Sequence, residues 1–127
     1  MKVKQVLLGA AILASSVSGP AVAQQAQYVQ IAELEIDPAQ LENYKAAVSE
    51  HAETAIRVEP GVLVLFAVSE KENPTHVRVF EVYRDIDAYK AHLEAPHFKK
   101  YKATVESMVK SLKLVLTTPI SLAAKSQ

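Results

Sequence analysis

Four histidines are the side chains best suited to acid–base chemistry near neutral pH, because an imidazole ordinarily titrates close to that range. They are His51, His76, His92 and His97. His92 ends one expected helix and His97 follows Pro96 at the start of the next. Either one could act as a general base in a pocket, although taken singly each is also an ordinary helix-end or packing residue. His76 lies beside a polar turn, where we expect it to be exposed.

A metal centre is a weaker interpretation of the same residues. His92 and His97 are five positions apart across a proline, not four apart on one helical face, and no carboxylate obviously completes a three-ligand set. The chain has no cysteine, which excludes thiol chemistry, iron–sulfur clusters and cysteine-based zinc sites. Its three glycines form no phosphate-binding loop. We therefore expect neither a metal nor a nucleotide cofactor.

Glu81 is a carboxylate inside the otherwise apolar run 79–83. If it faces the helices, it must be paired or protonated, because an unpaired buried charge is costly. Arg57, Arg78 or a histidine is a candidate partner. A pocket role and an ion pair that fastens strand to helix remain equally open.

Hydrophobic patterning predicts the elements that position these residues. Strands are expected at residues 28–36, 62–68, 76–83 and 112–118, with a charged turn at 70–75. Helices are expected at 38–57, at 86–95 and from about 97, the last with an apolar side running to Val109. This order is the ferredoxin-like βαββαβ pattern, an α+β fold with a four-stranded antiparallel sheet.

The second strand, Val62–Val68, is apolar throughout and is therefore expected to be buried on both faces. Both helical crossovers of this topology cover one face of the sheet, so the other face would expose a large apolar surface. A homodimer in which two such faces pack together, forming a shared barrel, is the economical solution.

The first 23 residues have the features of a secretory signal peptide. Lys2 and Lys4 precede a short apolar core, and small residues lead to a cleavage site near Ala23. Cleavage would remove two of the 14 basic and none of the 14 acidic side chains, so the mature net charge becomes −2. We expect one periplasmic, or alternatively secreted, domain at 24–127, with a core at 28–118 and a tail at 119–127. Nucleic acid is excluded as a partner, and the mature chain has no membrane span.

Four ordered motifs together resemble the antibiotic biosynthesis monooxygenase family, especially its quinol monooxygenase-like branch. They are Glu59–Leu63 (EPGVL), Phe80–Asp85 (FEVYRD), Ala88–His92 (AYKAH) and Ala95–Phe98 (APHF), followed by Tyr101. The resemblance extends from about Tyr28 to Thr118. It implies a dimeric α+β barrel with a pocket between the sheet and the helices of each subunit.

The resemblance also implies an activity, because oxygenases of this family oxidise quinols or polycyclic phenols with O₂, often without metal or flavin. Deprotonation of a hydroquinone gives an anion that can pass an electron to O₂, so the protein needs a base, an aromatic slot and a group that stabilises the anion. His92 and His97 match the H-x-x-x-P-H segment, and Glu81 and Tyr83 match the strand motif.

These matches give a hypothesis for the roles of the site residues. His97 or His92 is the base, and Glu81 orients it. The substrate-binding residues are Tyr83, Phe66, Arg57, His51 and Tyr101. Among them, Tyr83 and Phe66 form the walls of the pocket and Arg57 pairs with the substrate anion. O₂ is the co-substrate and no cofactor is required. The alternative is a non-catalytic dimeric protein that binds small hydrophobic molecules in the same pocket.

Overall fold

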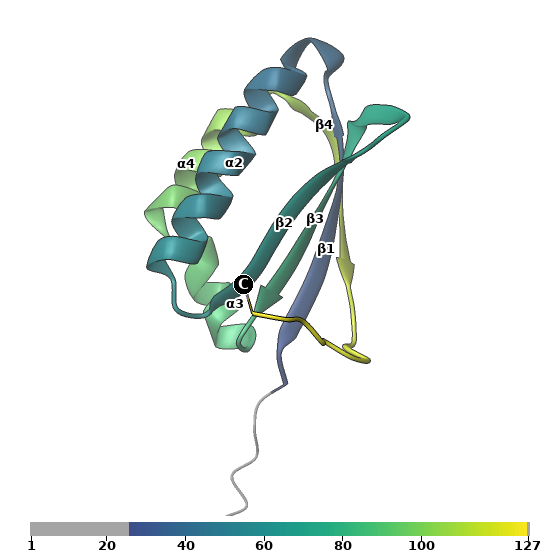
Figure 1. Cartoon of the computed structure of the whole chain (residues 1–127). Coiled ribbons are helices and arrows are strands. Elements are labelled where there is room, and N and C mark those ends of the chain that lie inside the picture. Colours follow the sequence, from purple (N-terminus) through teal and green to yellow (C-terminus); the bar gives the residue numbers. More distant parts are fainter. Residues whose placement is uncertain (1–25, 127) are drawn as a thin grey trace, which may run out of the picture.

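A computed structural model describes residues 26–126, which form one four-stranded sheet with helices on one of its faces (Figure 1). The predicted signal peptide, residues 1–23, lies outside the described residues. The strands are β1 (Tyr28–Ile36), β2 (Val62–Glu70), β3 (Asn73–Tyr83) and β4 (Val109–Leu116). The helices are the 3₁₀ turn η1 (Pro38–Gln40), α2 (Leu41–Val58), α3 (Ile86–Glu94) and α4 (Pro96–Val105).

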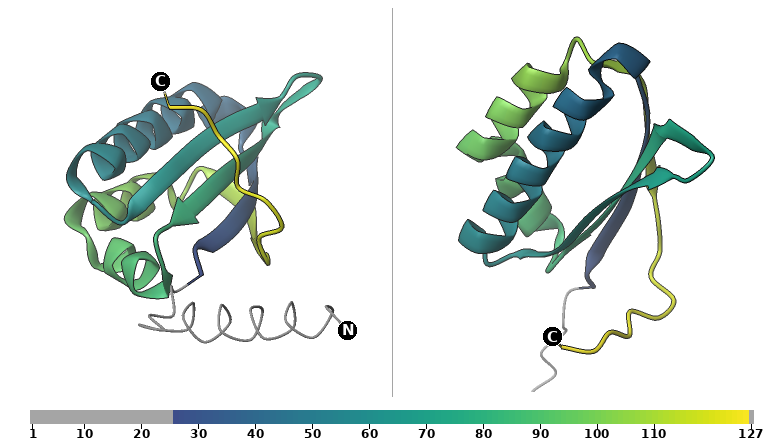
Figure 2. Two further views of the ribbon diagram at one scale, coloured as in Figure 1. Left: turned by 60° about the horizontal axis from the view of Figure 1, so that its bottom comes forward. Right: turned by 45° about the horizontal axis from the view of Figure 1, so that its top comes forward.

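The sheet is antiparallel throughout, with the strand order β2-β3-β1-β4. The predicted ferredoxin-like α+β fold is therefore confirmed. In Figure 1 and in the right view of Figure 2, α2 and α4 lie side by side over one face of the sheet, and α3 lies at one end of this helical layer. Within residues 26–126, no helix covers the other face.

The main differences from the predicted boundaries lie at three places. The expected helix at 38 begins as the turn η1, because Asp37 accepts a hydrogen bond from the Ala39 amide at 3.0 Å and closes that tight turn first. Strand β3 starts at Asn73, which pairs with Glu70, so the charged segment is a short hairpin turn.

The third difference is at the end of α4, which stops at Val105, so that β4 begins earlier than predicted. Val109 pairs with Ile36 across a register shift, and the Asp37 amide donates to the Met108 carbonyl at 2.8 Å. The apolar spacing favoured a helix that continues to Val109. In the structure a turn and a strand occupy these positions, and Val109 is partly buried in the strand.

The core lies between the sheet and α2, whose buried residues Tyr44, Val48, His51 and Ala55 recur at steps of three and four, as a helical face requires. They pack on buried strand residues that include Leu34, Ile36, Val77, Val79 and Leu65.

The open face of the sheet is uncovered in the single chain, as expected for one subunit of a homodimer, so burial of Val62–Val68 on both sides stays a prediction. Leu65 is buried beneath α2, whereas the side chain of Phe66 is 62% exposed and Val68 is 49% exposed. Phe80, the cross-strand partner of Phe66, is 39% exposed. A single subunit therefore leaves these apolar side chains in water.

The segment after β4 has no regular secondary structure up to residue 126. Its first residue is held to the sheet, because the Thr117 hydroxyl donates to the Val29 carbonyl at 2.7 Å. Ile120 is fully exposed. Within residues 26–126, none of the helices combines the length and the apolar character needed to cross a membrane.

Candidate functional site

The turn that follows α2 packs closely against α3, and this contact positions the residues of the site. A Cβ atom added to Gly61 would lie 2.5 Å from the Cβ of Ala88, so only glycine allows the two segments to come so close. Ala88 and His92 are one helical turn apart and are both buried on the same face of α3. Glu59, two residues before Gly61, is thereby brought beside His92.

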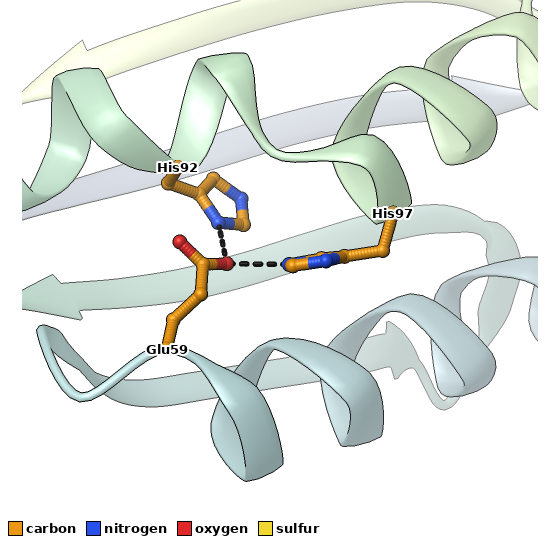
Figure 3. A group of neighbouring side chains, drawn as sticks. All are labelled: Glu59, His92 and His97. Carbon is orange, nitrogen blue, oxygen red and sulfur yellow. Dashed lines mark hydrogen bonds and ion pairs between the residues drawn. The ribbon is translucent and has the colours of Figure 1, made fainter.

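One carboxylate oxygen of Glu59 joins two histidines, as Figure 3 shows. The Nδ1 atom of His92 lies 2.7 Å from Oε2 of Glu59, and the Nε2 atom of His97 lies 2.5 Å from the same oxygen. A carboxylate accepts, so each ring donates an N–H through that nitrogen. The free nitrogens of the neutral rings are then Nε2 of His92 and Nδ1 of His97.

The two histidines differ in access. The side chain of His92 is 2% exposed, whereas those of His97 and Glu59 are each 15% exposed. His97 stands near the start of α4, directly after Pro96, which fixes the first turn of that helix. Of the two, His97 is therefore the one that an external molecule can reach.

A third histidine completes the cluster. The ring of His51 stacks on Tyr101 at 4.6 Å between centroids, and lies 5.0 Å from the ring of His92 and 5.7 Å from that of His97. Burial lowers the pKa of His51 to about 4, with smaller contributions from the two neighbouring histidines. His51 is thus neutral at neutral pH, and its buried Nδ1 atom has no hydrogen-bond partner in the described residues.

Glu81 belongs to a separate group of hydrogen bonds on the sheet. Its Oε1 atom accepts from the hydroxyl of Tyr83 at 2.7 Å and from Nε2 of Gln30 at 3.4 Å. Burial raises the pKa of the Glu81 carboxyl, although both hydrogen bonds act in the opposite direction. Burial also raises the pKa of Tyr83, which is completely buried. Tyr83 therefore remains a donor to Glu81 across the physiological range.

Two hollows lie between α2 and the sheet, away from the histidines. One, of about 300 Å³, is lined by residues that include Tyr44, Val48, Ala67 and Val77. The other, of about 310 Å³, is lined by Ala52, Glu53, Ile56, Arg57 and Leu65. Neither is lined by a histidine. One link from the first hollow to the cluster is the hydroxyl of Tyr44, which lies 2.8 Å from the hydroxyl of Tyr101.

The predicted site residues therefore fall into two sets. His51, His92, His97, Tyr83 and Tyr101 come together, and the ring centroids of Tyr83 and His92 are 5.3 Å apart. Phe66 lies on the open face of the sheet, and Arg57 is exposed beside the second hollow. Both were placed in the pocket from sequence, and the structure separates both from the histidines. Phe66 is at a strand position that faces away from the helices, and Arg57 is on a side of α2 that does not face the histidines.

The structure corrects two further expectations. Glu59, not Glu81, is hydrogen-bonded to the histidines, and this carboxylate completes a group of three possible metal ligands that the sequence analysis considered absent. From the sequence, Glu59 was only the first residue of the EPGVL motif and was given no chemical role. The motif is the available signal, because it places Glu59 two residues before Gly61, the residue that packs closely on α3.

Comparisons with known proteins agree with this fold. The sequence model of the antibiotic biosynthesis monooxygenase family matches residues 27–104. A candidate antibiotic biosynthesis monooxygenase from Bacteroides thetaiotaomicron is 46% identical, with a TM-score of 0.76 over 80% of this chain and 96% of that one. Among proteins of curated function, none matches the chain.

Two further solved structures are more distant. A candidate monooxygenase from Lactobacillus acidophilus is 29% identical with a TM-score of 0.71, over 75% of this chain and 46% of that one. A candidate antibiotic biosynthesis monooxygenase from Nitrosomonas europaea is 25% identical with the same TM-score, over 77% of this chain and 94% of that one.

Proposed function

Because the chain belongs to the antibiotic biosynthesis monooxygenase family, we propose that it oxidises a quinol or a related aromatic with O₂, and that His97 is the base. Members of this family are generally independent of cofactors. The quinol, the base and the oxygen chemistry are the parts of this proposal that require experiment.

The observation that carries the proposal is the hydrogen bond from His97 to the half-buried Glu59. A carboxylate that accepts from one imidazole nitrogen fixes the ring, makes the other nitrogen the proton acceptor and stabilises the imidazolium that forms. Here the free acceptor is Nδ1 of His97, on the more exposed of the two bonded rings. The bond from His92 to the same oxygen holds Glu59 in place from the buried side.

Deprotonation is the step that these residues can accelerate. A hydroquinone hydroxyl near Nδ1 of His97 would lose its proton to the ring, and the resulting anion is electron-rich enough to reduce O₂. The aromatic rings around the histidines, among them Tyr101 and Phe98, provide a low-dielectric wall in which proton transfer to a fixed base is favoured.

The test is O₂ uptake with a panel of substituted hydroquinones. For His97→Gln we expect a decrease in kcat of about 10²- to 10⁴-fold, the usual contribution of a general base. For Glu59→Gln we expect a smaller decrease with KM nearly unchanged, because the base remains but its orientation is lost. His76→Gln is the matched control, since His76 also lies beside a carboxylate, Glu35 at 3.0 Å, but outside the cluster.

Equal turnover in the wild type and His97→Gln would overturn the assignment of the base. The hollows between α2 and the sheet favour a second candidate function, a non-catalytic protein that binds small hydrophobic molecules, because their lining is largely apolar and contains no histidine. Tight binding of an aromatic without O₂ uptake by the wild type would decide for that function.

Export and dimer formation are also part of the proposal. The basic, apolar and small-residue pattern of residues 1–23 supports export with cleavage near Ala23. Intact-mass measurement of the protein from the periplasmic fraction of its host tests this, and a chain that retains Lys2 and Lys4 would contradict it. The exposed Phe66 and Phe80 support a homodimer through the open face of the sheet.

A further inference from the structure

The geometry points to a metal-binding site: we propose that Glu59, His92 and His97 bind one divalent first-row transition metal ion of the Zn²⁺ class. This inference is independent of the proposed oxidation. It concerns what the three side chains can bind, whatever reaction the protein catalyses.

The ligand atoms are already gathered. The Oε2 atom of Glu59, Nδ1 of His92 and Nε2 of His97 all lie within 4.8 Å of one another. Around a tetrahedral ion with metal–ligand bonds of about 2.0–2.1 Å, ligand atoms are about 3.4 Å apart. The two nitrogen–oxygen distances of 2.7 and 2.5 Å would therefore have to widen by less than about 1 Å. Rotation about the side-chain torsions of Glu59, which follows the last turn of α2, can supply this movement.

The charge and the burial of the group favour a cation. Glu59 supplies a carboxylate, and within residues 26–126 it forms ion pairs only with His92 and His97. The three side chains come from three segments that pack firmly together, namely the turn after α2, the end of α3 and the start of α4. A site whose ligands are held by separate packed segments loses little conformational freedom on binding.

An unsatisfied nitrogen in the same cluster is a second observation that points to a ligand. His51 is 7% exposed, its Nδ1 atom has no partner, and its ring lies beside both His92 and His97. A buried polar atom without a partner is unusual unless something missing from the protein atoms satisfies it. A water molecule bound to an ion in this cluster is the kind of partner that this nitrogen lacks.

The donor types indicate which ions fit. Two imidazoles and one carboxylate suit Zn²⁺, Co²⁺, Fe²⁺ or Ni²⁺, whereas Mg²⁺ and Ca²⁺ prefer sites made of oxygen atoms. Three protein ligands leave at least one coordination position for water or for a small molecule. Because the ion would replace the N–H groups that His92 and His97 donate to Glu59, we expect bound Zn²⁺ to inhibit any reaction that uses His97 as a base.

Direct metal binding tests the proposal without reference to turnover. The protein, prepared without a histidine tag and treated with a chelator, is titrated with Co²⁺ while its visible absorption is recorded, and Zn²⁺ is then used as a competitor. We expect one ion per chain, a Co²⁺ spectrum of low coordination number that Zn²⁺ abolishes, and no effect of Mg²⁺. Glu59→Gln and His97→Gln should each weaken binding at least about 100-fold, since even the loss of an outer-shell partner costs 10- to 100-fold.

The control is His76→Gln, which removes the histidine that lies near two carboxylates on the open face, Glu35 at 3.0 Å and Glu70 at 3.8 Å. It should bind Co²⁺ as the wild type does. The proposal is overturned if the wild type binds no Co²⁺ at concentrations on the order of 1 μM to 1 mM, or if Glu59→Gln binds it equally well.

Should either variant fail to fold by circular dichroism, the wild type still decides the question. Zn²⁺ must then protect His97, and not His76, from modification by diethylpyrocarbonate, and equal labelling of His97 with and without Zn²⁺ would refute the site. Loss of O₂ uptake alone has no bearing on this outcome, so failure of the proposed oxidation and failure of the metal site are distinguishable.

Discussion

Glu59 links three helices through its hydrogen bonds. Its Oε2 atom accepts hydrogen bonds from the end of α3 and the start of α4, while its backbone closes the last turn of α2 through a 2.9 Å bond from its amide to the Ala55 carbonyl. A side chain in this position contributes to stability as well as to any chemistry, because its removal leaves the buried imidazole of His92 and the largely buried imidazole of His97 without their acceptor.

Glu59→Ala removes this acceptor and should therefore lower the free energy of unfolding by about 1–3 kcal/mol, the usual cost of leaving such groups unsatisfied. Urea denaturation measures this. Glu50→Ala is a matched control, because Glu50 is also on α2 and also bonds to α4, through Lys100 at 2.7 Å, but on the exposed surface. We expect little change in the free energy of unfolding for this control. Equal effects of the two substitutions would show that the hydrogen bonds of Glu59 to the histidines stabilise the fold no more than an exposed ion pair does.

A second prediction at this scale concerns Glu81 and pH. Burial raises the pKa of this carboxyl in the folded state above its ordinary value, so between the two values the folded protein binds the proton more tightly than the unfolded chain. The free energy of unfolding must then fall as pH rises through this window.

Glu81→Gln removes that contribution while it keeps an acceptor for the Tyr83 hydroxyl. The stability of the variant relative to the wild type should therefore increase with pH, starting near the ordinary glutamate range. Thermal unfolding of both proteins between pH 4 and 8 gives the difference directly. A difference that is constant over this range would contradict the prediction.

At the scale of elements, the contact between Gly61 and Ala88 sets the distance between the turn after α2 and α3. Gly61→Ala would place two Cβ atoms 2.5 Å apart, which backbone movement must relieve. We expect a loss of about 1–3 kcal/mol, as is typical for overpacking. The movement should also separate Glu59 from His92, so O₂ uptake and Co²⁺ binding should weaken together.

The double variant Gly61→Ala/Ala88→Gly tests the cause. It removes the opposing Cβ atom, so the stability of the double variant should exceed the value expected from adding the two single effects. Strict additivity would mean that the close approach is not what destabilises Gly61→Ala.

The element pattern was predictable where local physics decides it. Four strands, their order along the chain and the buried face of α2 follow from hydrophobic spacing, and the caps at Asp37 and Asp85 follow from side-chain hydrogen bonding. The end of α4 was not predictable, because Val109 suits a helix and a strand equally and only its pairing with Ile36 decides.

The candidate site was predictable only in part, for a related reason. The histidines stand out by residue type, but the partner of His92 depends on a contact between segments that lie 33 residues apart. Phe66 and Arg57 were assigned to the pocket by residue type alone, whereas their direction depends on strand alternation and on which side of α2 faces α4.

For the whole molecule, the open face of the sheet makes a prediction about association. Phe66 and Phe80 pair across β2 and β3 and are exposed in a single subunit, so burial of this face between two copies should stabilise a homodimer. Sedimentation should give a mass of two chains, and Phe66→Glu should shift it toward one chain while the protein remains folded. Ile86→Glu, which changes a 47% exposed residue on α3, should leave the dimer intact.

The position of β1 in the sheet has a consequence for how the chain reaches its native state. The first strand pairs only with partners that come much later, Tyr28 with Tyr83 in β3 and Gln30 with Leu116 in β4. Loops of this length must close before β1, one of the two central strands, gains any ladder hydrogen bonds, and such non-local topologies fold slowly compared with helical ones. During synthesis, the sheet can be completed only after Leu116 of β4 has left the ribosome, so β1 waits for its partners until β3 and β4 have been made.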